Sequence, residues 1–289
     1  MTSGPQVTVS VSWLQEHIGS PGLVVMDASW YLPAEKRDCR AEFEASHIPG
    51  AVFFDIEALV DGDSDLPHML PPPEAFTSAM RELGISTDDR VVVYDSAGVF
   101  SSPRAWWMLR VFGHAHVSVL DGGLPAWRAA GGKLASSADE RGVDRRPGDF
   151  TAGKADPALL RSLSQVRDAI GDGSEQVLDA RSASRFRGEV PEPRPGLRSG
   201  HMPGAFNLPY AQVLDPDTQT LLAPDALKEQ FLAAGLDLQR PLVTTCGSGV
   251  SACVLSLAMA HATGRDAPVY DGSWAEWGRE GESEIGPRK

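Results

Sequence analysis

The chain has 289 residues, of which 42% are hydrophobic and 22% charged, and its formal net charge is −13. This length predicts two domains of about 140 residues each, while so acidic a chain lacks the basic surface that nonspecific nucleic-acid binding requires. We expect no membrane association and no secretory leader, because no apolar run approaches the ~20 residues of a membrane span and no basic segment precedes an apolar one at the start.

The first half alternates short β-rich runs with helix-like segments. The β-rich runs lie at residues 23–28, 51–56, 90–95 and 117–122, and helical patterns lie at 72–84 and 102–113. The second half offers further helical patterns at 223–235 and 251–264. Strands that alternate with helices predict an α/β fold in which a parallel sheet is covered by helices on both faces.

The second half repeats the first. Four blocks recur in the same order at offsets between 150 and 154 residues, centred on the pairs Asp27 and Asp179, His47 and His201, Asp95 and Cys246, and Asp121 and Asp271. Repeats with so long a period are whole domains rather than solenoid units. We therefore expect an N-terminal domain at 1–140, a polar linker at 141–156 and a C-terminal domain at 157–289.

Three cysteines, Cys39, Cys246 and Cys253, form neither a disulfide framework nor a metal-binding spacing. Their odd, sparse count is typical of a reducing compartment, so we expect a cytoplasmic protein without metal or cofactor. Cys253 lies inside an apolar helical pattern and is interpreted as a buried structural residue. Cys39 lies in a polar stretch and is interpreted as an incidental surface thiol.

Cys246 ends a β-rich run and is followed by the glycine-rich stretch "CGSGVS". Gly247 and Gly249 allow the backbone to curl so that several N–H groups point inward, and the next helix adds its dipole. Both features favour a thiolate, and Ser248 and Ser251 offer further hydrogen bonds. Ligands bind beyond the carboxyl ends of strands in such sheets. The pattern predicts a nucleophilic cysteine.

Other cysteine chemistries fit less well. A phosphatase with a Cys-x5-Arg loop needs an arginine where this chain has Ala252. A protease needs a histidine base, but His201 belongs to a repeated block whose other copy contains His47, which favours a structural role. The first copy has Asp95 in place of Cys246, so that copy is predicted to be inactive.

The repeated blocks, "GHMPGA" at 200–205, the cysteine loop and "YDGSWAEW" at 270–277 together resemble the tandem-domain rhodanese family of sulfurtransferases. The loop is similar to that of 3-mercaptopyruvate sulfurtransferases, whereas thiosulfate-using members carry basic residues after the cysteine. The resemblance implies that Cys246 takes the sulfur of 3-mercaptopyruvate as a persulfide, releases pyruvate, and passes the sulfur to cyanide, a small thiol or thioredoxin.

The resemblance also implies roles for individual residues. Two arginines hold the α-keto acid in this family, and they correspond to Arg185 and Arg194. Arg187 and Arg181 are nearby rivals for that role, although Arg181, in "DAR", is expected to make structural ion pairs instead. The implied catalytic residues are Cys246, Ser248 and Asp55, and the implied substrate-binding residues are Arg185, Arg194, His68, Gly247, Gly249, Val250 and Ser251. The alternative for Asp55 is a cap on a following helix.

Two other functions stay open from the sequence. A thiosulfate:cyanide sulfurtransferase would use the same fold and nucleophile, although the uncharged loop argues against it. A noncatalytic sulfur-carrier or redox-sensing module on this fold is the second alternative, and the presence of Cys246 argues against that.

Overall fold

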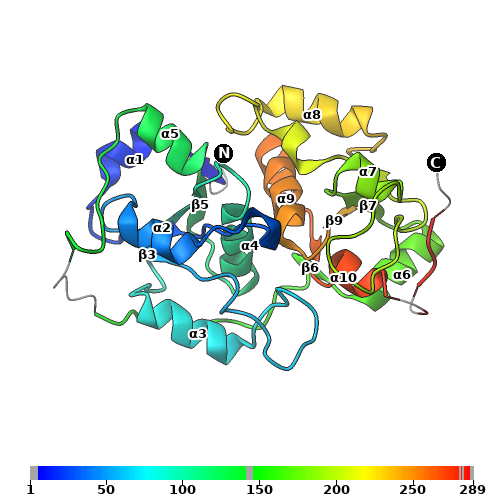
Figure 1. Ribbon diagram of the computed structural model, residues 1–289, viewed down its shortest axis with the longest axis horizontal. Helices are drawn as coiled ribbons and strands as arrows, with labels where there is room; N and C mark the ends of the chain where they lie inside the picture. Colours follow the sequence, from blue (N-terminus) through cyan, green and yellow to red (C-terminus); the bar gives the residue numbers. More distant parts are fainter. Residues whose placement is uncertain (1–5, 141–145, 280, 282, 287–289) are drawn as a thin grey trace. The chain divides into compact units, whose positions relative to one another are not determined.

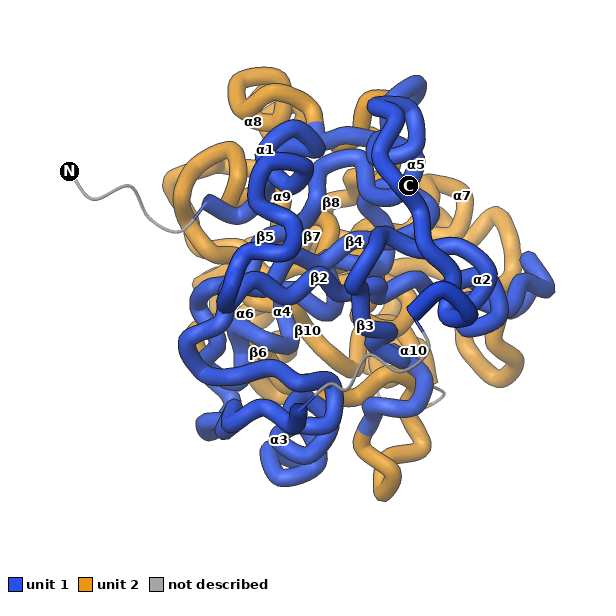
Figure 2. The backbone as a smooth tube through the Cα atoms, turned by 90° about the vertical axis from the view of Figure 1, so that its left-hand side faces the viewer, with its two compact units in different colours: residues 1–60, 71–156, 216–221 blue, residues 61–70, 157–215, 222–289 orange. Residues whose placement is uncertain are grey.

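The computed structural model describes residues 6–140, 146–279, 281 and 283–286 (Figure 1). The chain divides into two units. Unit 1 comprises residues 1–60, 71–156 and 216–221, and unit 2 comprises residues 61–70, 157–215 and 222–289 (Figure 2). In the described part of the chain, no helix is long and apolar enough to cross a membrane.

Unit 1 contains a five-stranded sheet in the order β1-β5-β4-β2-β3, with every neighbouring pair parallel. Helix α4 packs on β4 and β5. The elements of unit 1 are β1 (Thr8–Val9), α1 (Val11–His17), β2 (Leu23–Asp27), the 3-10 helix η1 (Pro33–Glu35), α2 (Cys39–Ala45), β3 (Val52–Phe53), α3 (Pro73–Glu82), β4 (Arg90–Tyr94), α4 (Ser102–Val111), β5 (Val117–Leu120) and α5 (Gly123–Ala129).

Unit 2 repeats this topology with the order β6-β10-β9-β7-β8, again parallel throughout. Helix α9 packs on β9 and β10, and α6 packs on β7. The elements of unit 2 are β6 (Leu160–Arg161), α6 (Leu163–Asp172), β7 (Gln176–Asp179), α7 (Ala183–Phe186), β8 (Phe206–Asn207), the 3-10 helix η2 (Tyr210–Val213), α8 (Pro224–Ala233), β9 (Leu242–Thr245), α9 (Val250–Thr263), β10 (Val269–Tyr270) and α10 (Ser273–Trp277).

The central strands are buried in both units, as expected for a parallel sheet packed against helices. Val92 of β4 and Val243 of β9 occupy equivalent places, and both are fully buried. Each unit has its own apolar cluster, with Trp127 in the first and Trp277 in the second. The predicted fold class, two α/β domains with parallel sheets, is confirmed.

Two short segments belong to the unit formed mainly by the other half of the sequence. Residues 61–70 are part of unit 2, and residues 216–221 are part of unit 1. The domain boundaries at 140 and 157 stay a prediction, and residues 141–145 of the expected linker lie outside the described residues. The exchange matters for the site, because it brings His68 into unit 2.

Candidate active site

Cys246 lies in the turn between β9 and α9, at the carboxyl end of the central strand of unit 2. Its backbone N–H donates to Ser273 Oγ at 3.2 Å, and its carbonyl accepts from Trp274 N at 2.9 Å. The carbonyl of Gly247 accepts from Ala275 N at 2.9 Å. The start of α10 therefore fixes the backbone on both sides of the thiol.

The thiol is buried and free, with Cys246 only 2% exposed. Gly249 precedes α9 with a φ of +78°, a conformation that favours glycine, and Val250 is the first helical residue. The turn thus places the sulfur-bearing residue at the N-terminus of a 14-residue helix. The positive end of that helix dipole stabilises a negatively charged sulfur.

Segment 61–70 covers the cysteine loop within unit 2. His68 Nδ1 lies 3.0 Å from Ser248 Oγ and 3.3 Å from the Ser248 carbonyl oxygen. Leu70 N donates to Asp271 Oδ2 at 2.8 Å, which fastens the end of the segment. His68 is 3% exposed and has a φ of +62°, unusual for a residue with a side chain. Such backbone strain is found at functional sites more often than elsewhere.

Four charged side chains form an alternating row beside the loop. Arg181 pairs with Asp179 at 2.6 Å and with Glu192 at 2.8 Å. Glu192 also accepts from Arg185 Nη2 at 2.5 Å. The guanidinium of Arg181 additionally lies over the Trp274 ring, 4.1 Å from its centroid. Arg181 is therefore a structural ion-pair residue, whereas Arg185 is the arginine at the loop.

Arg185 lies directly against the residue after the cysteine. A Cβ built on Gly247 would lie 3.0 Å from Arg185 Nη2. The backbone of Gly247 does not need positive φ, so the absence of a side chain there serves this close approach. The structure thus brings together six of the expected site residues in unit 2: Cys246, Gly247, Ser248, Gly249, His68 and Arg185.

The remaining expected residues are placed less directly. Val250 and Ser251 form the first turn of α9, with Val250 buried and Ser251 half-buried. Arg194 is half-buried in the irregular segment between α7 and β8. Asp55 belongs to unit 1, where its Oδ1 accepts from Glu57 N at 3.2 Å and Ala58 N at 3.1 Å. That carboxylate caps a turn rather than a helix, and the catalytic role of Asp55 stays a prediction.

Sequence reasoning missed Glu192, Asp271 and Ser273. Asp271 and Ser273 lie in the repeated block "YDGSWAEW", which indicates the duplication and the family but assigns no role to its individual residues. Glu192 lies in "PEPRPG", next to the expected Arg194. The sequence offered one signal for Glu192, which is that it lies among several arginines. A carboxylate that becomes buried needs cationic partners, and these arginines could supply them.

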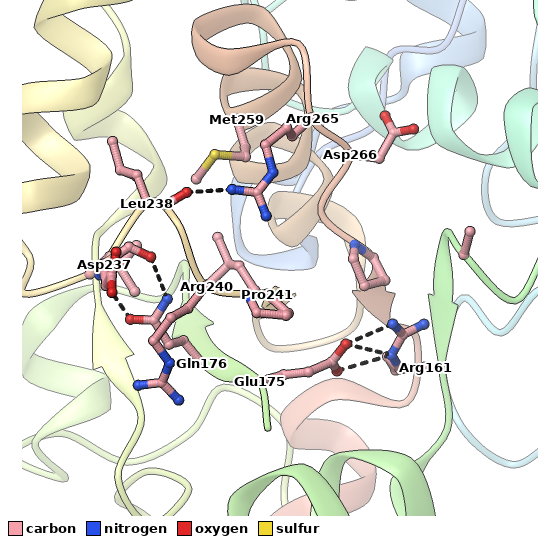
Figure 3. Close-up of a pocket in the computed structure, with 14 residues that line it drawn as sticks. Arg161, Glu175, Gln176, Asp237, Leu238, Arg240, Pro241, Met259, Arg265 and Asp266 are labelled. Atoms are coloured by element: carbon pink, nitrogen blue, oxygen red, sulfur yellow. Dashed lines mark hydrogen bonds and ion pairs between the residues drawn. The ribbon is translucent and has the colours of Figure 1, made fainter. Parts of the chain in front are cut away.

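A pocket of about 230 Å³ lies elsewhere in unit 2, beside the first residues of β7 and β9 (Figure 3). Among its lining residues, Arg161 pairs with Glu175 at 2.7 Å, and the neutral Gln176 exchanges hydrogen bonds with the Asp237 backbone at 2.8 and 2.9 Å (Figure 3). Since parallel sheets bind ligands at their carboxyl ends, this pocket is not the candidate site. No cluster of three potential metal ligands occurs among the described residues.

Comparison with known proteins gives consistent matches. The model of the rhodanese-like domain family matches residues 10–130 and 162–280. The chain is 44% identical to the "Thiosulfate/3-mercaptopyruvate sulfurtransferase 1, mitochondrial" of Arabidopsis thaliana, over 96% of this chain and 76% of that one. It is also 44% identical to the 3-mercaptopyruvate sulfurtransferase of Escherichia coli (strain K12), over 97% and 98% of the two chains. The crystal structure of SseA from Escherichia coli superposes with a TM-score of 0.84 at 42% identity, over 93% of this chain and 99% of that one.

Proposed function

Because this chain belongs to the rhodanese family, as its two matched domains and its full-length relatives show, we propose that it is a sulfurtransferase that takes sulfur from 3-mercaptopyruvate through a persulfide on Cys246. The observation that carries the proposal is the buried Cys246 at the carboxyl end of β9, with the Arg185 guanidinium against the next residue, Gly247. A thiolate nucleophile and a cation for the donor's carboxylate are the two groups that this reaction needs.

In the first half-reaction, the Cys246 thiolate attacks the sulfur of 3-mercaptopyruvate. The S–S bond forms as the donor's C–S bond breaks, and the electron pair leaves on carbon as the enolate of pyruvate. Protonation of that carbon gives pyruvate, and Cys246 keeps the persulfide. The turn before α9 stabilises the anionic sulfur through the dipole and N–H groups of the helix.

In the second half-reaction, an acceptor attacks the outer sulfur and Cys246 leaves as a thiolate. Cyanide gives thiocyanate, a small thiol gives its own persulfide, and a reduced thioredoxin gives a disulfide with release of hydrosulfide. We propose these acceptors as a class, because each is a nucleophile toward sulfur. Three free cysteines suit a reducing compartment, and we propose the cytoplasm.

The roles proposed for the surrounding residues rest on their contacts or, for Arg194 and Asp55, on the resemblance to the family. Arg185 and Arg194 hold the α-keto acid of the donor, because a planar guanidinium can make two hydrogen bonds to one carboxylate. The hydroxyl of Ser248, held by His68 at 3.0 Å, hydrogen-bonds the reacting groups. Gly247, Gly249, Val250 and Ser251 supply the backbone of the cradle, and Asp55 is proposed to complete the site from its place in the sequence motif.

A thiosulfate:cyanide sulfurtransferase is the second candidate. The name of the Arabidopsis thaliana relative includes thiosulfate as well as 3-mercaptopyruvate. The uncharged residues 247–252 favour the carboxylate donor instead. A noncatalytic module is the third candidate, and Cys246 is the observation against it.

A donor screen tests the proposal. Purified protein is treated with 3-mercaptopyruvate or thiosulfate, and peptide mass spectrometry measures the addition of one sulfur at Cys246 while pyruvate and thiocyanate release are followed. We expect the sulfur adduct and faster turnover with 3-mercaptopyruvate. Faster turnover with thiosulfate would establish the second candidate, and no adduct with either donor would establish the third.

A further inference from the structure

Arg185 is held by one carboxylate. Its Nη2 donates to Glu192 Oε2 at 2.5 Å and its Nε lies 3.4 Å from Glu192 Oε1, so one edge of the guanidinium faces Glu192. The Arg185 side chain is 23% exposed, whereas the Glu192 side chain is 1% exposed. The carboxylate is therefore the fixed partner, and the arginine is the one that reaches the surface of the site.

Glu192 is fixed in turn by a second, fully buried arginine. Arg181 Nη1 donates to Glu192 Oε1 at 2.8 Å, and the Arg181 side chain is 0% exposed. Arg181 is itself anchored by Asp179 at 2.6 Å and by the Gly200 carbonyl at 2.8 Å. This chain of contacts leads from the end of β7 to Arg185, and each member has little freedom to move.

Arg185 also lies against the cysteine loop, through the same Nη2 that bonds Glu192. A Cβ on Gly247 would lie 3.0 Å from Arg185 Nη2, 3.8 Å from Nη1 and 3.9 Å from Cζ. Few real contacts are this short, so a side chain at 247 and the present position of the guanidinium compete for the same space. Arg185 is thus confined between Glu192 and Gly247.

We propose that Glu192 is the positioning residue that holds Arg185 against Gly247, and that this pair of contacts sets the preference of the site for a donor bearing a carboxylate. The inference rests on the proposed function. A guanidinium held by one edge keeps its other donors in a fixed plane, which suits the planar carboxylate and keto oxygens of an α-keto acid. A tetrahedral sulfonate gains less from that plane.

The first test is Glu192→Gln, which keeps the shape and removes the charge. The matched control is Glu189→Gln, which removes a carboxylate from the exposed Arg187–Glu189 pair at 2.7 Å. We expect kcat/KM for 3-mercaptopyruvate to fall about tenfold or more in E192Q, mainly through KM, because misplacing a binding group weakens substrate binding and alignment. With thiosulfate the fall should be under about threefold, and E189Q should match the wild type with both donors.

The second test reaches the same guanidinium without touching the buried ion pairs. Gly247→Ala adds one methyl group at a residue whose backbone accepts alanine. Like E192Q, it should lower the ratio of kcat/KM for 3-mercaptopyruvate to kcat/KM for thiosulfate. In an Arg185→Ala background, E192Q should leave the donor ratio unchanged, because its target is gone.

The outcomes separate this inference from the proposed function. A wild type that releases no pyruvate from 3-mercaptopyruvate would refute the proposed function. If the wild type is active and the ratio of kcat/KM for the two donors is the same in E192Q and E189Q, the role of Glu192 is overturned. If E192Q does not fold, the G247A variant decides, and an unchanged donor ratio in that variant overturns the inference.

Discussion

In unit 1 Asp95 follows β4, and in unit 2 Cys246 follows β9, at the same step of the repeated fold. Both residues are buried, at 1% and 2% exposed. The Asp95 carbonyl accepts from Leu124 N at 2.9 Å, and the Cys246 carbonyl accepts from Trp274 N at the same distance. The scaffold around the two residues is thus preserved while their side chains differ.

Asp95 fills its own loop with negative charge. Its Oδ2 accepts from the N–H groups of Phe100, Ser101 and Ser102 at 2.9, 3.0 and 2.8 Å, and from Ser102 Oγ at 2.6 Å. Its Oδ1 accepts from Ala97 N at 2.9 Å. The loop of unit 1 is therefore an anion cradle whose anion is built into the chain.

The covering segments show the same correspondence. His68 covers the cysteine loop of unit 2, and Gln219 lies against Gly98 in the loop of unit 1. Both have positive φ, at +62° and +57°. Leu221 N donates to Asp121 Oδ1 at 2.8 Å, as Leu70 N does to Asp271. The comparison teaches that the two units share a loop and its covering segment; in unit 1 the loop holds the Asp95 carboxylate, and in unit 2 we propose that it holds the sulfur carried by Cys246.

The largest expected effect comes from removing the proposed nucleophile of unit 2. Cys246→Ser should fold normally and lose turnover, by a factor on the order of 10⁶ as for other nucleophile deletions, because a hydroxyl is a poor sulfur nucleophile. Pyruvate release and the sulfur adduct are the measurements. Cys253→Ser is the control and should keep most activity. Substantial turnover in C246S would show that the two loops do not differ in the way described.

Removing the built-in anion should destabilise unit 1 instead. Asp95→Ala leaves buried donors without their acceptor, which costs about 1–3 kcal/mol each in isolation. Entry of water and relief of the buried charge reduce the total to about 3–5 kcal/mol. Hydrogen exchange of amides 97–102 reports the change locally. Exchange as slow as in the wild type would mean that Asp95 does not organise the loop.

The arginines distinguish the site of unit 2 from the loop of unit 1. Two residues after Asp179 the chain has Arg181, whereas two residues after the equivalent Asp27 it has Ser29. Arg185→Ala and Arg194→Ala should each lower kcat/KM for 3-mercaptopyruvate about 10- to 150-fold, the equivalent of a lost charge-assisted hydrogen bond. Arg187→Ala is the control. Equal falls with thiosulfate would assign the two arginines to the fold rather than to donor binding.

A smaller effect is expected from making the two covering segments alike. His68→Gln places in unit 2 the residue type that unit 1 has in Gln219. Replacing a hydrogen bond to Ser248 by a weaker one should lower kcat about 5- to 10-fold. The pH profile of kcat separates the possibilities, because an unchanged profile with unchanged kcat would give His68 a purely structural role.

The smallest effect concerns the strand ends. Burial raises the pKa of Asp27 above its usual range, with hydrogen bonds from Ser29 opposing the shift. A raised pKa means that the folded state holds the proton more tightly. The contribution of Asp27 to the free energy of unfolding is therefore fully present below about pH 4, and it is lost as pH rises through the folded pKa. Relative to the wild type, Asp27→Asn should gain stability over that range, and thermal unfolding from pH 4 to 7 measures the difference. Parallel curves would contradict the expectation.

The sequence was sufficient for the fold because duplication and alternation are both periodic signals. The runs at 90–95 and 251–264 became β4 and α9 with shifts of one residue at their ends. The short elements β1, β6, α7 and α10 carry too few residues for a period to appear. Their places follow from parallel pairing with distant strands and from tertiary contacts, which no local pattern contains.

The sequence predicts a site residue where that residue would act through its own chemistry, and these roles stay predictions. Cys246 was identified by its loop, and Arg185 by the family motif. Glu192 was missed because its ion pairs with Arg181 and Arg185 form only in the folded chain, where its side chain is buried. The placement of Gly247 against Arg185 was missed for the same reason. From the sequence, glycine at 247 was attributed to backbone freedom. In the structure, Gly247 does not have a positive φ, and a side chain there would crowd Arg185.

The exchange of residues 61–70 and 216–221 has a consequence for the order of synthesis. The ribosome releases the first sheet before residues 216–221 exist, so the loop at Asp95 waits for its cover for about 5–20 seconds of translation at about 5–20 residues per second. Residues 61–70, in contrast, are made long before the sheet they serve. A gene cut between the two copies would therefore encode two products, each missing the strip of chain that closes its loop.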